Sequence, residues 1–316
     1  MNSQRAIVPD ALTLSGPHGP LPVRVYRPAE PAGVGLVWLH GGAFFGGNLD
    51  MPEAEWVSGQ LAARGITVVS VDYRLAPIPA GWTPSPGTEP RGISAAGAPG
   101  NDGARFPVAS EEAAVAFRWA AGGGTAGALP DAAPAAWAIG GASAGGNIAT
   151  GAALRLGRER AASGTGVPGT PVPDAAPVLV VLAYPTLHAV QPEPSAELAS
   201  TLEAARAAGN GGALDAARTL QMYRNYAGPA LEDPLAVPGL AGPAELADFP
   251  PTIMGNSEAD FLRASGEGFA ATLRAAGREV ESFTEPGTWH GHLNDPGAPA
   301  ALATLERFAA RLLTLA

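Results

Sequence analysis

The sequence contains no cysteine and no lysine, and each absence excludes a class of chemistry. Without cysteine the chain has no thiol nucleophile, disulfide, thiolate zinc site or iron–sulfur cluster. Because all 19 basic residues are arginine, it also has no lysine for a Schiff base, a pyridoxal phosphate anchor or a P-loop. Hydroxyl nucleophiles, carboxylates and the five histidines are therefore the main candidates for catalysis.

Charge and long apolar runs are scarce as well. Only 15% of residues are charged, against about 25% in an average globular chain, and the net charge is −10. A net negative chain without a basic stripe argues against nucleic-acid binding. The longest apolar run, residues 176–184, is too short for a membrane helix, and the N-terminus has no apolar signal-peptide core. We expect a soluble, cytoplasmic protein that binds neither nucleic acid nor membrane.

Apolar runs alternate with helical patterns along the chain, and no internal repeat is visible. Several runs are almost continuously apolar, which is typical of strands buried on both faces of a parallel sheet. The predicted strands are residues 23–26, 35–40, 66–73, 137–142, 177–184, 252–255 and 279–283. The predicted helices are residues 53–64, 110–121, 145–160, 213–226, 263–276 and 299–313. This alternation predicts an α/β fold with a mostly parallel central sheet flanked by helices.

We interpret residues 1–316 as a single domain with one large insertion. Residues 186–249 lie between two predicted strands and read as largely helical, so they should cover one edge of the sheet like a cap. Residues 77–105 and 162–177 are rich in Gly and Pro and have no periodicity, which is typical of long surface loops. An edge strand or a terminal helix could pair in a homodimer, but nothing in the sequence singles out such a contact.

The strongest chemical signal is Gly141-Ala142-Ser143-Ala144-Gly145, which fits the pattern G-x-S-x-G. It follows a predicted strand and precedes a predicted helix, where a sharp turn presents the serine hydroxyl above the sheet. The positions around the serine must be small because larger side chains would clash in this turn. In a chain with 42 glycines the pattern can also arise by chance, so it needs support from a second motif.

That second motif is His40-Gly41-Gly42-Ala43-Phe44, directly after the predicted strand 35–40. Small residues at this place allow backbone N–H groups to approach an oxyanion that develops during acyl transfer. Alone, the two glycines would indicate only a tight turn. Together with the serine motif downstream, they indicate an oxyanion hole.

The motifs HGGAFFGG, VVSVDYRLAP, GGASAGGN, VLAYP, SEADFLR and TWHGH occur in the order seen in one known group of enzymes. The chain resembles the α/β-hydrolases of the hormone-sensitive-lipase-like group, bacterial esterase family IV, from about residue 23 to the C-terminal helix. The resemblance implies an α/β-hydrolase fold and a Ser-His-acid site with Ser143 as nucleophile. It also implies an oxyanion hole built from the backbone N–H groups of Gly41, Gly42, Ala43 and Ala144.

The resemblance implies a particular acid and base. The acid follows the nucleophile and precedes the histidine, and the family pattern favours Asp260 over its rival Glu258. His290, which is followed by glycine as in the family, is the expected base, and His292 occupies a position where the family usually has Phe. The expected pocket residues are Phe44, Phe45, Trp289, His292 and Leu293.

These residues predict a serine carboxylesterase that hydrolyses small to medium acyl esters through an acyl-enzyme, with no metal or organic cofactor. An amidase, carbamate hydrolase or acyl-peptidase with the same triad is the alternative, since this triad serves all acyl transfers. A non-catalytic ligand-binding protein on the same fold is the third hypothesis, although such a protein would be expected to lose a triad member.

The sequence departs from the family at several places. Ala43 replaces the third glycine of H-G-G-G, and Ala142 replaces the usual Asp before the nucleophile. Residues 1–22 contain little helix signal, so we expect the N-terminal part of the family's helical cap to be missing. We hypothesise that the loop 77–105, with Trp82, borders the mouth of the active site and partly replaces that cap; a solvated surface loop is the alternative.

Overall fold

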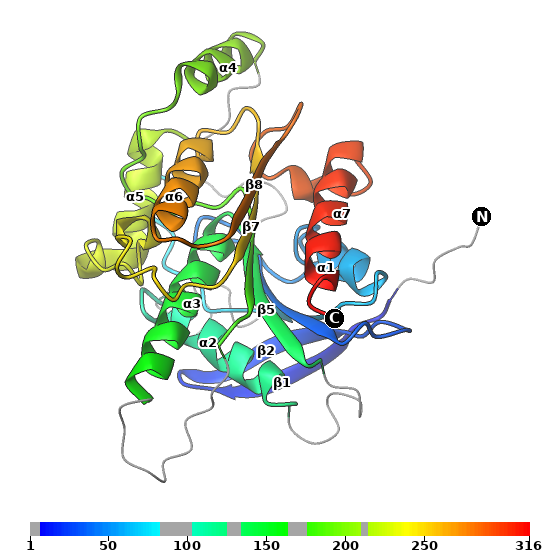
Figure 1. Cartoon of the computed structure of the whole chain (residues 1–316). Helices are drawn as coiled ribbons and strands as arrows, with labels where there is room; N and C mark the ends of the chain where they lie inside the picture. The colour runs from blue at the N-terminus through cyan, green and yellow to red at the C-terminus, as the bar shows by residue number, and fades with distance from the viewer. Residues whose placement is uncertain (1–6, 83–102, 125–133, 164–175, 210–213) are drawn as a thin grey trace.

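Eight strands of the described chain form one sheet in the order β1-β2-β4-β3-β5-β6-β7-β8 (Figure 1). The structure is a computed structural model that describes residues 7–82, 103–124, 134–163, 176–209 and 214–316. The strands are β1 (Asp10–Gly16), β2 (Gly19–Tyr26), β3 (Val34–Leu39), β4 (Thr67–Val71), β5 (Ala136–Ala142), β6 (Leu179–Ala183), β7 (Thr252–Ser257) and β8 (Val280–Glu285). β2 runs antiparallel to β1 and β4, and every other pair of neighbours is parallel. The prediction of a mostly parallel central sheet is confirmed.

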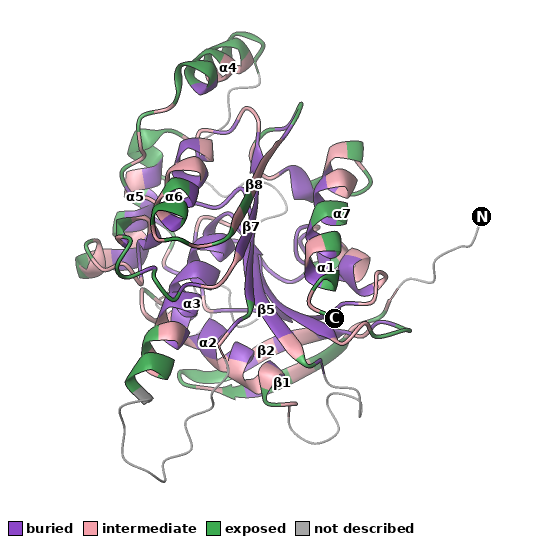
Figure 2. Ribbon diagram, in the orientation of Figure 1, coloured by how far each residue is buried: buried purple, intermediate pink, exposed green. Residues whose placement is uncertain are grey.

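The helices cover both faces of this sheet (Figure 1). They are α1 (Glu55–Ala62), α2 (Val108–Ala121), α3 (Ala144–Ser163), α4 (Ala196–Ala207), α5 (Ala216–Ala227), α6 (Arg263–Ala275) and α7 (Pro299–Leu313). α1 and α7 share one core cluster with the sheet, and α2, α3, α5 and α6 contribute to a second cluster on the other face. Every residue of β3, β4 and β6 is buried, as Figure 2 shows for the sheet, because both faces are covered. This explains their continuous apolar runs.

The sequence pattern does not predict the strand β1. It pairs with β2 as an antiparallel hairpin whose turn begins at Gly16 and ends at Gly19. Leu14 points into the core and the neighbouring positions are more exposed, so the strand alternates with period two. The pattern was hard to recognise because the strand carries only two large apolar residues, Leu12 and Leu14. Residues 10–26 thus form a β-hairpin, and that the N-terminal part of the family's helical cap is missing stays a prediction.

The insertion 186–249 contains α4, α5 and two short 3₁₀ helices, η2 (Gly228–Ala230) and η3 (Pro238–Leu240). α4 stands apart from the sheet and is largely exposed, with only Leu198 buried (Figure 2). Its first turn is capped by Ser195, whose side chain accepts the Leu198 N–H at 3.1 Å. That this segment acts as a cap stays a prediction.

The predicted loops fall mostly outside the described part of the chain. Residues 83–102 of the loop 77–105 and residues 164–175 of the loop 162–177 are among those that the structure does not describe. The described end of the first loop, Trp82, packs edge-on against Phe45, with the ring centroids 5.0 Å apart. The guanidinium of Arg218 on α5 lies 5.3 Å from the centroid of the Trp82 ring. The role of this loop at the active-site mouth stays a hypothesis. In the described parts of the chain, no helix is long and apolar enough to cross a membrane.

Three histidines packed into the fold predict how stability depends on pH. Burial lowers the pKa of His40, His188 and His292 to about 4. Between the ordinary histidine value of about 6.5 and pH 4, the unfolded chain binds protons at these sites and the folded chain does not. The free energy of unfolding should therefore fall as the pH drops, by at most about 1.4 kcal/mol per pH unit for each histidine.

Urea unfolding at pH 7, 6 and 5 measures this slope. His290 opposes the trend only above the ordinary histidine value: its pKa is raised in the folded protein, so protonation stabilises the fold between that folded pKa and about 6.5, and its contribution is constant below. Glu53 opposes it too, because burial raises the pKa of its carboxyl, and we expect the three buried histidines to outweigh both sites. An unfolding free energy that is equal at pH 7 and pH 5, or higher at pH 5, would contradict the prediction.

Candidate active site

The candidate site residues gather at the carboxyl edge of the sheet. Ser143 directly follows β5, and the loop beginning at His40 directly follows β3. Asp260 lies three residues after the end of β7, and His290 five residues after the end of β8. These strands are parallel, so their carboxyl ends meet at one edge, where α/β sheets usually bind their ligands.

Ser143 sits in a strained turn between β5 and α3. Its φ is +52°, in the left-handed region that a residue with a side chain rarely adopts, at a cost of about 1–3 kcal/mol. The turn is held by the Ser143 N–H, which donates to the carbonyl of Ala183 at 2.9 Å. A Cβ at Gly145 would collide with the carbonyl of Leu39, so glycine is required where α3 passes β3. The small residues of the G-x-S-x-G motif therefore have a steric explanation.

The side chains of Ser143, His290 and Asp260 form a continuous hydrogen-bonded chain. Ser143 Oγ lies 2.9 Å from His290 Nε2, and His290 Nδ1 lies 2.7 Å from Asp260 Oδ2. Asp260 is 2% exposed, whereas the His290 side chain is 25% exposed. With Nδ1 donating to the carboxylate, Nε2 is free to accept the serine proton. This arrangement has the geometry that an activated serine nucleophile requires.

The structure separates the two candidate acids. Asp260 faces His290 through Oδ2, and its other oxygen accepts the Leu262 N–H at 2.9 Å, as in a capping turn. The Glu258 carboxylate instead accepts the Gly287 N–H at 2.8 Å. Glu258 therefore braces the loop that leads to His290, and the imidazole is paired with Asp260.

The two neighbouring histidines have different surroundings. Burial lowers the pKa of His290, but the attraction of the Asp260 carboxylate, the hydrogen bond that His290 donates to it and the charge of Glu53 outweigh burial and raise the pKa above its ordinary value. His292 is buried, and its Nδ1 and Nε2 lie 2.8 Å from Ser257 Oγ and 2.9 Å from Thr304 Oγ1. Neither nitrogen of His292 is left for a substrate.

The loop after β3 supplies backbone N–H groups next to Ser143. Gly42 and Ala43 have φ of +122° and +56°, so Ala43 adopts a conformation that suits the glycine usual at this position. Within the described residues, the N–H groups of Gly42, Ala43 and Ala144 donate to no protein acceptor. They are available to an oxyanion. His40 bonds the carbonyl of Gly41 through Nδ1 at 2.6 Å and stacks on Tyr73, which supports this loop.

Gly41 differs from the expectation that its N–H helps to hold the oxyanion. That N–H donates to Glu53 Oε1 at 2.7 Å, and Glu53 is 2% exposed. A buried carboxylate binds a backbone donor strongly, so the group is not free for a substrate. The prediction of four free donors is therefore corrected to three.

The predicted pocket residues are mostly buried in the core. Leu293 is fully buried in the cluster of α1 and α7, so its assignment to the pocket is wrong. Phe44 is 1% exposed and stacks on Tyr226 with centroids 4.0 Å apart. Phe45 is also buried and packs against Trp82, and Trp289 alone among the five has a largely exposed side chain. Of the five predicted pocket residues, only Trp289 therefore offers a large exposed surface. The apolar residues among the others were assigned wrongly from residue type, because large apolar side chains near a site often pack into the core.

Three polar residues at the site were not predicted from the sequence: Glu53, Tyr184 and Asn294. Tyr184 OH donates to Glu53 Oε2 at 2.9 Å, and Asn294 Nδ2 donates to the same oxygen at 3.0 Å. Tyr184 belongs to the motif VLAYP, but nothing in that motif indicates a bond to Glu53, from which Tyr184 and Asn294 are separated by 131 and 241 positions.

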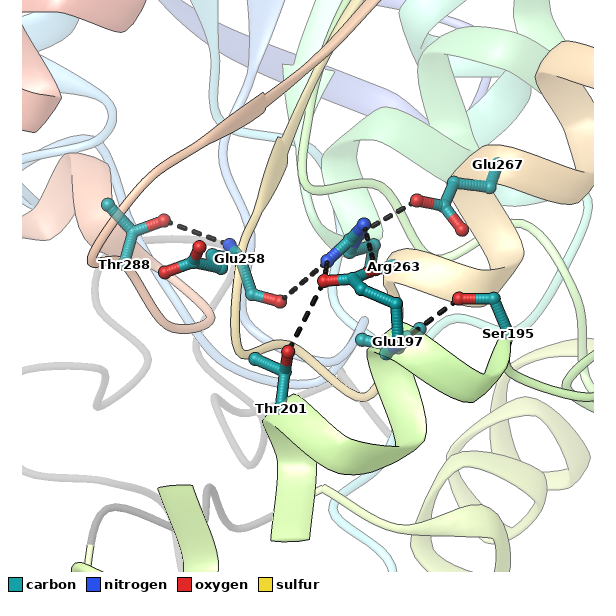
Figure 3. A network of polar contacts seen from close by, with 8 residues as sticks. Ser195, Glu197, Thr201, Glu258, Arg263, Glu267 and Thr288 are labelled. Carbon is teal, nitrogen blue, oxygen red and sulfur yellow. Dashed lines mark hydrogen bonds and ion pairs between the residues drawn. The ribbon is translucent and has the colours of Figure 1, made fainter. Parts of the chain in front are cut away.

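An arginine links the acid loop to the insertion (Figure 3). Arg263, the first residue of α6, pairs with Glu197 on α4 at 2.7 Å and with Glu267 at 2.7 Å. It also donates to the carbonyl of Glu258 at 3.3 Å. Since Glu197 is exposed, the pair contributes little free energy, but it connects α4 to the loop that carries Asp260.

In the described parts of the chain, no group of three or more acidic, histidine or cysteine side chains is arranged to hold a metal ion. The chemistry available at the site is that of Ser143, His290, Asp260 and the nearby N–H donors.

Comparison with known proteins supports the fold. A family model described as alpha/beta hydrolase fold matches residues 36–80 and 102–294. Ethyl acetate hydrolase from Pseudomonas putida is 31% identical over 277 residues, which cover 85% of this chain and 70% of the relative. The carboxylic ester hydrolase LipN from Mycobacterium tuberculosis is 32% identical over 311 residues, which cover 95% of this chain and 68% of LipN.

Solved structures of esterases share this fold. The crystal structure of esterase LipW from Mycobacterium marinum matches with a TM-score of 0.72 and 25% identity, covering 98% of this chain and 82% of LipW. These matches confirm the resemblance indicated by the sequence motifs. The chain belongs to the α/β-hydrolase family.

Proposed function

We propose that this protein is a serine carboxylesterase of the hormone-sensitive-lipase-like group. The observation that carries the proposal is the hydrogen-bonded chain from Ser143 through His290 to Asp260, with distances of 2.9 and 2.7 Å. The relatives support the bond type, since two of them are named as hydrolases of ethyl acetate and of carboxylic esters.

The reaction follows from this geometry. His290 Nε2 takes the Ser143 proton while Oγ attacks the ester carbonyl, and Asp260 stabilises the imidazolium that forms. The N–H groups of Gly42, Ala43 and Ala144 hold the oxyanion, each contributing about 3 kcal/mol to lowering the barrier. The alcohol leaves with the proton from His290. Water, deprotonated by His290, then attacks the acyl-enzyme, and His290 returns the proton to Ser143 Oγ as the carboxylic acid leaves.

The substrates we propose are small to medium acyl esters. Phe44 and Phe45 follow the oxyanion loop but are buried against other aromatic rings, so they offer little surface to a substrate. Trp289, next to His290, presents an exposed apolar surface that suits an acyl or alcohol group. A cytoplasmic location and homodimer formation stay predictions of the sequence.

A matched pair of substrates tests the proposal. We expect kcat/KM to be higher for p-nitrophenyl acetate and butyrate than for p-nitroacetanilide, because p-nitrophenolate leaves without a proton, whereas the amine of the anilide must take one from His290 as it leaves. An anilide or carbamate that is cleaved as efficiently as the esters would favour the amidase alternative. If no substrate turned over and a fluorophosphonate did not label Ser143, the protein would be a ligand-binding member of the fold.

A further inference from the structure

Glu53 is a buried carboxylate that the proposed mechanism leaves unused. It lies two residues before α1 and is 2% exposed, and both its backbone and its side chain form hydrogen bonds. Its carbonyl accepts the Trp38 indole N–H at 2.7 Å, and its N–H donates to Asn294 Oδ1 at 3.3 Å. These bonds fix the position from which the carboxylate reaches the site.

The two carboxylate oxygens bind different loops. Oε1 accepts the Gly41 N–H at 2.7 Å, on the loop that continues into Gly42 and Ala43. Oε2 accepts the Asn294 side chain at 3.0 Å, four residues beyond His290. A Cβ at Gly41 would collide with Oε1, so the backbone approaches the carboxylate as closely as only glycine permits. One side chain therefore joins the oxyanion loop to the loop that carries the histidine.

The same oxygen reaches His290 by a second route. Tyr184 OH donates to Oε2 at 2.9 Å, and the Tyr184 ring packs edge-on against His290 with centroids 5.2 Å apart. Burial raises the pKa of Glu53, and the donors from Tyr184, Gly41 and Asn294 together with the charge of His290 offset part of that effect. The carboxylate accepts from three donors, as its ionised form requires.

We propose that Glu53 is a positioning residue for ester hydrolysis. By binding Gly41 on the oxyanion loop and Asn294 on the loop that carries His290, it fixes the Gly42 and Ala43 donors relative to the His290 imidazole. The inference rests on the proposed function of the site. Removing the link would let the oxyanion donors and the base move relative to one another. A displacement of about 1 Å in such an arrangement can cost about 100-fold in rate.

Stability alone does not explain the placement of this carboxylate. An ionised group whose folded pKa is raised by burial destabilises the folded chain at neutral pH, and replacing it by a neutral group of the same shape relieves that cost. A structural residue should lower Tm when it is replaced. A positioning residue should instead lower kcat.

The test is Glu53→Gln in the full chain, with p-nitrophenyl butyrate as substrate. The glutamine amide keeps the shape of the side chain and removes its charge. Its NH₂ group replaces one of the two carboxylate oxygens, so it faces either the Gly41 N–H or the Tyr184 and Asn294 donors and cannot accept from them. We expect kcat to fall about 10- to 100-fold with KM little changed. The rise of kcat/KM with pH should also move to lower pH, because Glu53 is one of the two charges that raise the pKa of His290, the other being Asp260.

Glu112→Gln is the matched control. Glu112 is also fully buried, and it accepts the Arg74 backbone N–H at 2.8 Å as well as the Arg74 guanidinium. It binds no residue of the candidate site. This variant should lower Tm, because Arg74 loses its partner, and leave kcat and the pH profile unchanged.

The outcomes are distinguishable. A folded Glu53→Gln variant with the parent's kcat and pH profile overturns the inference while leaving the proposed function intact, whereas an inactive parent chain contradicts the proposed function itself.

Should Glu53→Gln not fold, Tyr184→Phe removes one hydrogen bond to Oε2 and keeps the ring against His290. It should lower kcat in the same direction by a smaller factor, and an unchanged kcat in that variant also overturns the inference.

Discussion

Ser143→Ala is expected to abolish the hydrolysis of p-nitrophenyl butyrate, with kcat lowered by about 10⁶-fold if the triad acts as a unit. The alanine removes the oxygen that lies 2.9 Å from His290 Nε2 and that attacks the ester carbonyl in the proposed mechanism. Fluorophosphonate labelling should be lost together with turnover, and Tm should change little because Ser143 Oγ bonds only His290.

Ser265→Ala provides a matched control. Ser265 Oγ also lies 2.9 Å from a histidine nitrogen, Nδ1 of His188, and it accepts the N–H groups of Leu187 and His188. It is fully buried, whereas Ser143 is 8% exposed at the end of a strained turn. This control should lose stability and keep its activity. Retention of activity in Ser143→Ala would show that the nucleophile has been assigned wrongly.

The contrast between these serines shows why motif order was informative. A Ser–His contact is common in this structure, since Ser257 bonds His292 and Ser265 bonds His188. Only Ser143 follows a parallel strand directly and stands beside unpaired backbone donors in the described chain. A motif that directly follows an apolar run can be recognised in the sequence. Because parallel strands bring their carboxyl ends to one edge of the sheet, motifs at such positions are expected to lie close together.

The parts that could not be predicted depend on contacts across the fold. Gly41 was expected to bind the oxyanion, but its N–H is taken by a carboxylate 12 residues away that belongs to no recognised motif. Leu293 follows the histidine motif closely, yet the 3₁₀ helix η4 (His292–Asn294) turns it into the core beneath α7. Neither outcome follows from residue type or spacing, since both depend on which loop packs against which.

Asp260→Asn is expected to lower kcat by about 10⁴-fold while leaving the site's geometry in place. The amide can present its N–H₂ group to His290 Nδ1, which then has to accept, so that Nε2 carries the proton and cannot take the one on Ser143. The negative charge that stabilises the imidazolium is lost as well. Steady-state kinetics at several pH values measure the effect, since a variant with the wrong tautomer stays slow even where His290 is neutral.

Glu258→Gln is the decisive companion to that variant, because Glu258 is the other acid that the family pattern allowed. Its carboxylate accepts the Gly287 N–H at 2.8 Å, which the oxygen of a glutamine amide can also accept. Its kcat should therefore stay within a few-fold of the parent, while the kcat of Asp260→Asn collapses. If the two variants behaved in the opposite way, His290 would be oriented by Glu258 during turnover, and the loop between β7 and α6 would have to rearrange when substrate binds.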